Sequence, residues 1–261
     1  MTSADVLIVG AGIAGASLAF QLAGRCKVVI LESESQPGYH ATGRSAALFT
    51  TSYGQPIIRA LTLASRAFFE NPPPEFTATP LLRPRSVLWV AREDQLGRLD
   101  AFLSEVATFD PSVRACPLDE ALRLFPVLDR DYVAAAVVEP DACDIDVHAL
   151  HQGYLRAFKA RGGEVINAAP VQEIRNLGTS WQVAARGKTY SCGVAVNAAG
   201  AWADEIATLA GAAPVGLIAK RRTAITFDPP AGVDIDEWCC VLDFDEEFYI
   251  KPDAGRLLAS P

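Results

Sequence analysis

Near the N-terminus, two apolar runs are joined by a glycine-rich turn in the segment "ADVLIVGAGIAGASLAFQLAG". The first run predicts a buried strand over residues 6–9, and the second predicts a helix over residues 13–23. A further apolar segment, "KVVILE", predicts another strand after a short turn. Strand, helix and strand in this order are typical of a βαβ unit, whose parallel sheet is covered by helices on both faces. The opening of the chain therefore predicts an α/β fold.

The turn has the spacing GxGxxG, and Glu32 ends the next strand seventeen residues after Gly15. In this context Gly10 allows a tight turn, Gly12 lets the backbone approach a pyrophosphate, and Gly15 lets the helix pack on the strand. The N-terminus of the helix would face the phosphates, and Glu32 would accept hydrogen bonds from ribose hydroxyls. We therefore expect contacts with a dinucleotide from Gly10, Gly12, Ile13, Ala14, Gly15 and Glu32.

The fingerprint leaves the ligand open. A glycine-rich turn can occur without any ligand, and GxGxxG alone does not separate NAD from FAD. Glu32 would repel a 2′-phosphate, which argues against NADP. A flavin dinucleotide would need further surfaces for its ribityl chain and ring system. Two segments of small residues, "TGRSAA" and "NAAGAW", are candidates because small side chains let a backbone come close to a ligand.

The composition narrows the class of partner. The formal net charge of −8 argues against nucleic acid and anionic membrane surfaces. The apolar N-terminal segment could also be read as a membrane span, but Asp5 and three closely spaced glycines argue against that reading, and a signal peptide would need a positive start. The six cysteines lack CxxC spacing, so we expect reduced thiols in a cytoplasmic protein.

Further elements follow from periodicity and from turn residues. Helices are predicted over residues 55–71 and 202–210, with two short helices between residues 93 and 126. Another helix should follow Asp144 or Asp146, either of which can cap it, and should end at Gly162 and Gly163. Strands are predicted over residues 81–92, 164–169, 181–186 and 193–197. The last part is rich in strands and includes a hairpin with its turn at residues 252–255.

Along the chain, the predicted secondary structure is first α/β, then mixed, then α/β again and finally β. This order predicts two interleaved domains. We expect residues 1–80 and 145–214 to form the dinucleotide-binding domain, and residues 81–144 and 215–261 to form a substrate-binding domain. Since the chain stops just after a predicted hairpin strand, we also expect it to be a fragment of a longer protein.

The chain resembles the FAD-dependent D-amino acid oxidase family in six segments: "ADVLIVGAGIAGASLAFQL", "LESESQPGYHATGRSAA", "DIDVHALHQGYLR", "VNAAGAWADEIA", "KRRTAITF" and "FYIKPDAG". Within the family it is most similar to the bacterial D-arginine dehydrogenases. The resemblance implies a Rossmann-like FAD-binding domain interleaved with a mixed β-sheet substrate domain, and non-covalently bound FAD. It also implies roughly a hundred further residues after the end of this chain.

The resemblance implies a flavoprotein oxidoreductase that acts on an amino acid, by hydride transfer from Cα to flavin N5. The imino acid formed would hydrolyse to a 2-oxo acid and ammonia, and the electron acceptor stays open. Further contacts with the cofactor are implied for Arg44, Ser45, Ala46, Ala47, Val171, Ala199, Gly200 and Trp202.

The catalytic pocket implied by the resemblance contains Tyr53, Arg222 and Tyr249. Arg222 would bind the substrate carboxylate in a fork geometry, and the tyrosine hydroxyls would line the same pocket. From the residues alone, the favoured interpretation is the ordinary one: the arginine as a solvated strand end, and each tyrosine as a core ring with its hydroxyl at the surface.

The histidines have less specific roles. His148 and His151 lie three residues apart on a predicted helix and could bind a metal, but no further ligands complete a recognisable set, so we interpret them as packing and capping residues. His40 lies in the expected flavin-side segment, where it could bond to the backbone or the cofactor.

Two positions depart from the D-arginine dehydrogenases. Leu48 stands where those enzymes have a histidine, and Val87 stands where they have a glutamate that faces the substrate guanidinium. A cationic side chain would lack its partner there, so a neutral, probably D-, amino acid is expected. Glu246 or Glu247 could restore an acidic group from another direction. The rival functions are a glycine- or sarcosine-type oxidase using oxygen, and a dinucleotide-binding protein without catalysis.

Overall fold

The computed structural model describes residues 2–261, which form two compact units. The first contains the chain up to Ala46, Pro72–Leu81 and Asp146–Lys220, and the second contains Ala47–Asn71, Leu82–Ile145 and Arg221–Pro261. The predicted boundaries differ mainly at residues 47–71, which group with the second unit. The reason is pairing with residues far away in the sequence, because this segment supplies a strand and several hydrogen bonds to that unit.

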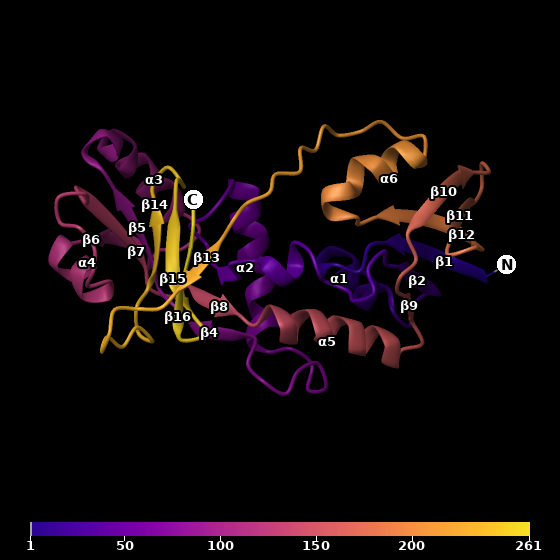
Figure 1. Ribbon diagram of the computed structural model, residues 1–261, viewed down its shortest axis with the longest axis horizontal. Helices are drawn as coiled ribbons and strands as arrows, with labels where there is room; N and C mark the ends of the chain where they lie inside the picture. The colour runs from indigo at the N-terminus through magenta and orange to yellow at the C-terminus, as the bar shows by residue number, and fades with distance from the viewer. Residues whose placement is uncertain (1) are drawn as a thin grey trace. The chain divides into compact units, whose positions relative to one another are not determined.

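A six-stranded sheet in the order β10-β11-β12-β1-β2-β9 organises the first unit (Figure 1). Strands β12, β1, β2 and β9 run parallel, whereas β10, β11 and the start of β12 form an antiparallel meander. The elements in chain order are β1 (Thr2–Val9), α1 (Ile13–Leu22), β2 (Val28–Leu31), η1 (Thr42–Arg44), α5 (Val147–Ala160), β9 (Glu164–Ile166), β10 (Val171–Asn176), β11 (Trp181–Ala185), β12 (Lys188–Asn197), η3 (Gly200–Trp202) and α6 (Ala203–Leu209).

Helices α1 and α5 run side by side in this unit (Figure 1). Three aromatic rings pack edge to face or tilted around this contact: Phe20 of α1, Tyr154 of α5 and Phe76, with centroids 5.0 to 5.6 Å apart. A side chain at Gly153 would overlap the Phe76 ring, which explains a glycine in the middle of α5. Phe76 thereby ties residues 72–81 to the first unit.

The other face of the parallel strands is covered by the meander. Leu7 and Leu31 from the parallel strands share one buried cluster with Val183 and Tyr190 from β11 and β12. Strand β2 and the second half of β1 are therefore buried on both faces, as the continuous run "VLIV" predicted, whereas β9 and β12 are partly exposed.

A seven-stranded sheet in the order β13-β16-β15-β14-β5-β7-β6 organises the second unit, together with a small sheet in the order β3-β8-β4. The elements are β3 (Leu48–Phe49), α2 (Pro56–Glu70), β4 (Leu82–Pro84), β5 (Val87–Ala91), η2 (Glu93–Arg98), α3 (Leu99–Val106), β6 (Arg114–Cys116), α4 (Leu118–Leu124), β7 (Ala135–Glu139), β8 (Cys143–Ile145), β13 (Ile225–Phe227), β14 (Cys240–Asp243), β15 (Tyr249–Asp253) and β16 (Arg256–Ser260).

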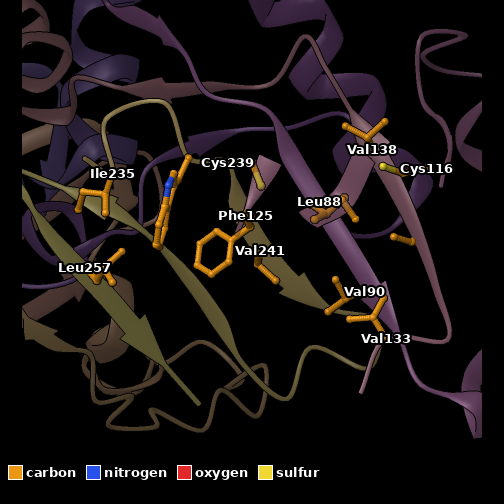
Figure 2. Close-up of a cluster of buried hydrophobic side chains, with 13 residues drawn as sticks. Leu88, Val90, Cys116, Phe125, Val133, Val138, Ile235, Cys239, Val241 and Leu257 are labelled. Atoms are coloured by element: carbon orange, nitrogen blue, oxygen red, sulfur yellow. The ribbon is translucent and has the colours of Figure 1, made fainter. Parts of the chain in front are cut away.

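Strand β5 is buried on both faces because a different helix covers each face. Leu88 and Val90 join the cluster that contains Ala121 of α4 and Phe125, which Figure 2 shows beside Val241. The alternate residues, including Val87 and Trp89, join a second cluster, which contains Leu99 and Val106 of α3. The alternation of side chains along a strand assigns each residue to its cluster.

Several predicted elements differ from the structure in their bounds. The strand expected over residues 81–92 is divided into β4 and β5, and the strand expected over residues 193–197 is the end of the longer β12. Strand β10 was missed because its sequence, "VQEIRN", is mostly polar and exposed. The helix over 55–71 is confirmed as α2, and Asp146 rather than Asp144 caps α5, with its carboxylate accepting from the Ala149 N–H at 2.8 Å.

The predicted hairpin is confirmed, but its turn is displaced by one residue. Asp253 pairs with Arg256, so the two-residue turn consists of Ala254 and Gly255, both with positive φ. Two positive φ angles are typical of a type I′ turn, which matches the twist of the strands better than the turn expected at residues 252–255. Within the described part of the chain, no helix combines the length and the apolar composition needed to cross a bilayer.

Candidate functional site

The glycine loop between β1 and α1 has the geometry that the fingerprint predicts. Gly10 has a φ of 102°, and a side chain there would come within 2.5 Å of the Ala198 carbonyl oxygen. A side chain at Gly15 would overlap the Gly10 carbonyl, so only glycine lets α1 pack this closely on the loop. At Gly12 the nearest neighbour is the Thr42 hydroxyl, 3.2 Å from where a Cβ would lie. A ligand can therefore come close to the backbone of this loop.

The N-terminus of α1 begins beside this loop. Gly12 is the N-cap residue, and as a glycine it has no side chain that could hydrogen-bond to the first N–H groups of the helix. The side chains of Ile13 and Ala14 are exposed, while the Ile13 N–H donates to the Thr42 hydroxyl at 3.0 Å. A helix end of this kind favours an anion such as a pyrophosphate. The contribution of Thr42 was missed, because no local pattern links it to a loop thirty residues earlier.

Glu32 has a different set of partners from the expected one. One carboxylate oxygen accepts from the Ala11 N–H at 2.8 Å, and the other accepts from the Glu34 N–H at 2.9 Å. The residue is only 8% exposed. The carboxylate thus holds the glycine loop against the end of β2. The oxygen that bonds to Glu34 also accepts from the Ser33 hydroxyl at 3.2 Å, so the oxygen that bonds to Ala11 is the one that keeps a second lone pair for another donor. Its contact with ribose hydroxyls stays a prediction.

Aromatic ring packing connects the two small-residue segments, "TGRSAA" and "NAAGAW", through residues within or next to them. His40 packs against Trp202 with centroids 4.6 Å apart, and its Nε2 lies 2.9 Å from a Glu34 oxygen. The Arg44 guanidinium lies 4.9 Å from the centroid of the Tyr39 ring. These contacts hold the segment around η1 beside η3, both within the first unit.

The remaining candidate cofactor residues, apart from Ala47, belong to the first unit. The Ala199 N–H donates to the Asn197 side chain at 3.2 Å, and Gly200 follows with a φ of 55°. Val171 begins β10 opposite Ala185, just after Ala169, whose N–H donates to the Glu32 carbonyl at 2.8 Å. Ser45 and Ala46 close the first segment of the first unit, whereas Ala47 lies in the second unit, where its carbonyl accepts from the Ile145 N–H at 2.7 Å.

The three predicted catalytic residues come together in the second unit. The Arg222 guanidinium lies 5.7 Å from the centroid of the Tyr249 ring, and the Tyr53 side chain interacts with both Arg222 and Glu246. Partial burial and the Glu246 carboxylate raise the pKa of Tyr53, while Arg222 acts in the opposite direction. The Tyr53 hydroxyl is therefore neutral at physiological pH and can donate.

A buried carboxylate fixes the segment that precedes Tyr53. Glu139, with no exposed surface, lies at the end of β7 within hydrogen-bond distance of five donor atoms of Thr50, Thr51 and Ser52. The Trp89 indole N–H donates to Ser52 Oγ at 2.8 Å, and its ring stacks on Tyr53 with centroids 6.4 Å apart. Glu139 was missed, because it is separated from its partners by almost ninety residues.

An apolar wall lies beside this cluster. Leu48 and Tyr249 are both packed against the buried cluster that contains Val87 and Leu242. The two positions that depart from the D-arginine dehydrogenases therefore share one hydrophobic core cluster: Val87 is a buried member, and Leu48 packs against it as Tyr249 does.

His151 has a specific partner that was not predicted. Its Nε2 lies 2.7 Å from the Ala11 carbonyl oxygen of the glycine loop, while His148 on the same helix is exposed. Between residues 2 and 261, no three His, Cys, Asp or Glu side chains are arranged to hold a metal ion.

Comparisons with known proteins agree with this geometry. Residues 5–261 match the family model described as "DAO: FAD dependent oxidoreductase". The chain is 25% identical to mitochondrial dimethylglycine dehydrogenase of Rattus norvegicus, in an alignment that covers 99% of this chain and 31% of the relative. It thus spans about a third of the length of that curated relative.

Solved structures show the same fold. Glycine oxidase from Geobacillus kaustophilus superposes with a TM-score of 0.83 at 23% identity, over 100% of this chain and 72% of that chain. L-proline dehydrogenase from P. horikoshii gives a TM-score of 0.79 at 18% identity, over 99% and 69% of the two chains. A particular closeness to D-arginine dehydrogenase is not among these findings. The glycine loop fits a flavin dinucleotide, and the chain belongs to the DAO family of FAD-dependent oxidoreductases.

Proposed function

We propose that the protein oxidises a neutral 2-amino acid, preferably of D configuration, to a 2-oxo acid and ammonia. FAD, when bound, supplies the redox chemistry by accepting the hydride that leaves the substrate Cα. The observation that carries the proposal is the cluster of Tyr53, Arg222 and Tyr249 beside an apolar wall. One end of this cluster suits a carboxylate, and the other suits an apolar side chain.

Arg222 is the group that would bind the substrate carboxylate. Its guanidinium lies over the Tyr249 ring, and its Nε donates to the Pro261 carbonyl at 3.1 Å. These two contacts limit its orientation, and the two Nη groups can donate to the carboxylate. The neutral hydroxyl of Tyr53 lies beside the guanidinium and can donate to the same carboxylate. These residues bind and orient the substrate, so that Cα is held in one place without a protein nucleophile.

Leu48 and Val87 support a neutral substrate. Both pack in the apolar cluster that includes Tyr249, and Val87 has no exposed surface. A cationic side chain placed against this wall would lose its hydration without gaining a partner, and that costs several kcal/mol in order of magnitude.

Glu246 favours a second candidate substrate class. Its carboxylate raises the pKa of Tyr53, whereas the cationic Arg222 lowers it, and Glu246 belongs to the exposed turn between β14 and β15. A D-amino acid with a cationic side chain could pair with this carboxylate from the solvent side. The Leu48 and Val87 wall therefore favours D-leucine, and Glu246 favours D-arginine.

A glycine-type or N-methylglycine-type oxidase is the other alternative. Its support is the likeness to glycine oxidase and to dimethylglycine dehydrogenase, whose names imply small substrates. Leu48 argues for a larger substrate, because this half-buried leucine gives an apolar side chain a partner that glycine would not use.

Anaerobic titration of the FAD-loaded protein tests these alternatives. Oxidised flavin absorbs at about 450 nm, and reduction by a substrate bleaches this band. We expect D-leucine to bleach the band faster than L-leucine, D-arginine, glycine or sarcosine. Faster bleaching by D-arginine would favour the role of Glu246, and faster bleaching by sarcosine would overturn the neutral amino acid assignment. Oxygen consumption after mixing with air then separates an oxidase from a dehydrogenase.

A further inference from the structure

His151 of α5 reaches the glycine loop from a distant part of the sequence. Its Nε2 lies 2.7 Å from the Ala11 carbonyl oxygen, and the side chain is 4% exposed. A buried ring that bonds to one backbone atom is held more firmly than a packing residue, because the bond fixes the ring rotation as well as its position. The sequence explains His151 only as a packing or capping residue, so this contact needs a separate explanation.

The Ala11 residue is held at both of its backbone polar atoms. Its N–H donates to the Glu32 carboxylate at 2.8 Å, and its carbonyl accepts from His151. Ala11 itself has no exposed surface. Since a peptide group is planar and trans, fixing the Ala11 carbonyl also fixes the Gly12 N–H, which points in the opposite direction, away from His151. One imidazole therefore sets the direction of a donor in the loop that faces the dinucleotide.

The surroundings of the ring support this role. A Cβ at Gly38 would lie only 2.9 Å from His151 Cε1, so the backbone of the segment before η1 closes one side of the ring. Burial lowers the pKa of His151, which keeps the imidazole neutral at physiological pH. The neutral ring must then carry its proton on Nε2 in order to donate to a carbonyl.

We propose that His151 is a positioning residue for FAD, which orients the Ala11–Gly12 peptide so that the Gly12 N–H faces the pyrophosphate. The residues of the loop fit such a group, because the three glycines leave its backbone open and α1 directs its N-terminus to the same place. The role of His151 does not depend on which amino acid, if any, the protein oxidises.

Binding measurements on the purified full chain test the proposal. FAD and ADP are titrated separately into apoprotein of the wild type and of His151→Leu, His151→Asn and His151→Gln. The leucine and asparagine variants lack a donor that reaches Ala11, so we expect about tenfold weaker binding of both ligands. The glutamine variant keeps a donor at a similar distance and should recover most of the affinity. His148→Leu, on the exposed face of the same helix, is the matched control and should bind as the wild type does.

The pattern of results distinguishes positioning from packing. Thermal unfolding of each apoprotein reports on packing alone, and the asparagine variant keeps the comparison available if the leucine variant does not fold. Equal affinities for all variants, or an equal loss in the glutamine and leucine variants, would overturn the proposal. A wild type that binds neither FAD nor ADP would overturn it as well, whereas a wild type that binds FAD but oxidises no amino acid would contradict only the proposed function.

Discussion

Two loops of this protein are built around buried carboxylates, one in each unit. Glu32 bonds to the backbone of the glycine loop and is 8% exposed, whereas Glu139 bonds to residues 50–52 and is fully buried. Glu32 accepts from two backbone N–H groups and one hydroxyl, whereas Glu139 accepts from two backbone N–H groups and three hydroxyls. A buried carboxylate therefore has a different effect in each unit. Glu32 holds a loop whose backbone stays open to a ligand, whereas Glu139 fixes the segment that positions Tyr53.

The largest expected effect comes from removing the more buried carboxylate. Glu139→Leu would leave several buried donors of Thr50, Thr51 and Ser52 without an acceptor, and each such group costs about 1–3 kcal/mol. We expect the free energy of unfolding to fall by at least about 3 kcal/mol in denaturant titrations. Glu75→Gln, at an exposed position, is the control. A Glu139→Leu protein as stable as the wild type would show that the network contributes nothing net.

The next largest effect is expected at the carboxylate-binding arginine. Arg222→Ala should raise KM for the amino acid by about a hundredfold, because one charge-assisted fork is lost. FAD affinity should not change, because Arg222 belongs to the second unit and not to the glycine loop. Steady-state kinetics and a flavin titration measure the two quantities. Arg256→Ala, which removes an exposed arginine paired with Asp228, should alter neither, and an unchanged KM in Arg222→Ala would refute its assignment.

The glycine-loop carboxylate should affect the cofactor more than stability. In Glu32→Gln the amide keeps one acceptor but turns a donor toward the Ala11 or Glu34 N–H, so we expect about tenfold weaker FAD binding. The unfolding free energy of the apoprotein should fall by less than in Glu139→Leu. Glu205→Gln, on the exposed side of α6, serves as the control. A loss of stability larger than that of Glu139→Leu would break the contrast between the two loops.

The smallest expected effect concerns the pH dependence of the tyrosine. The Glu246 carboxylate raises the pKa of Tyr53, so Glu246→Gln should lower this pKa. The donating hydroxyl is lost as the pH rises through the pKa, and kcat/KM should therefore begin to fall at a lower pH in the variant. Glu247→Gln removes the neighbouring carboxylate, which pairs with Arg92 instead, and should leave the profile unchanged. Identical profiles for both variants would remove Glu246 from the site.

The first loop could be predicted from the sequence because its parts are close together. Gly10, Gly12, Gly15 and Glu32 lie within one βαβ unit, where strand and helix lengths fix their spacing. Thr42 and His151, which complete the loop, were missed because contacts that span 29 and 140 residues have no local periodicity. The second loop was reached only through the family resemblance, which brought Tyr53, Arg222 and Tyr249 together but not Glu139.

One boundary between the two units could not be predicted from the sequence. Residues 47–71 look like a continuation of the first unit, because a helix follows a small-residue segment there. Pairing of β3 with β8 and the bonds to Glu139 instead join this segment to the second unit. Nonlocal strand pairing decides such boundaries, and hydrophobic periodicity does not report it.

The position of β1 in its sheet has a consequence for how the chain is made. Its neighbours are β2, which follows at once, and β12, so that Val9 pairs with Asn197. A ribosome must therefore synthesise most of the chain before one edge of β1 is covered, a delay on the order of ten seconds or more at typical rates. During that time an apolar strand edge is open to wrong pairing. We expect nascent chains that end before β12 to depend on chaperones.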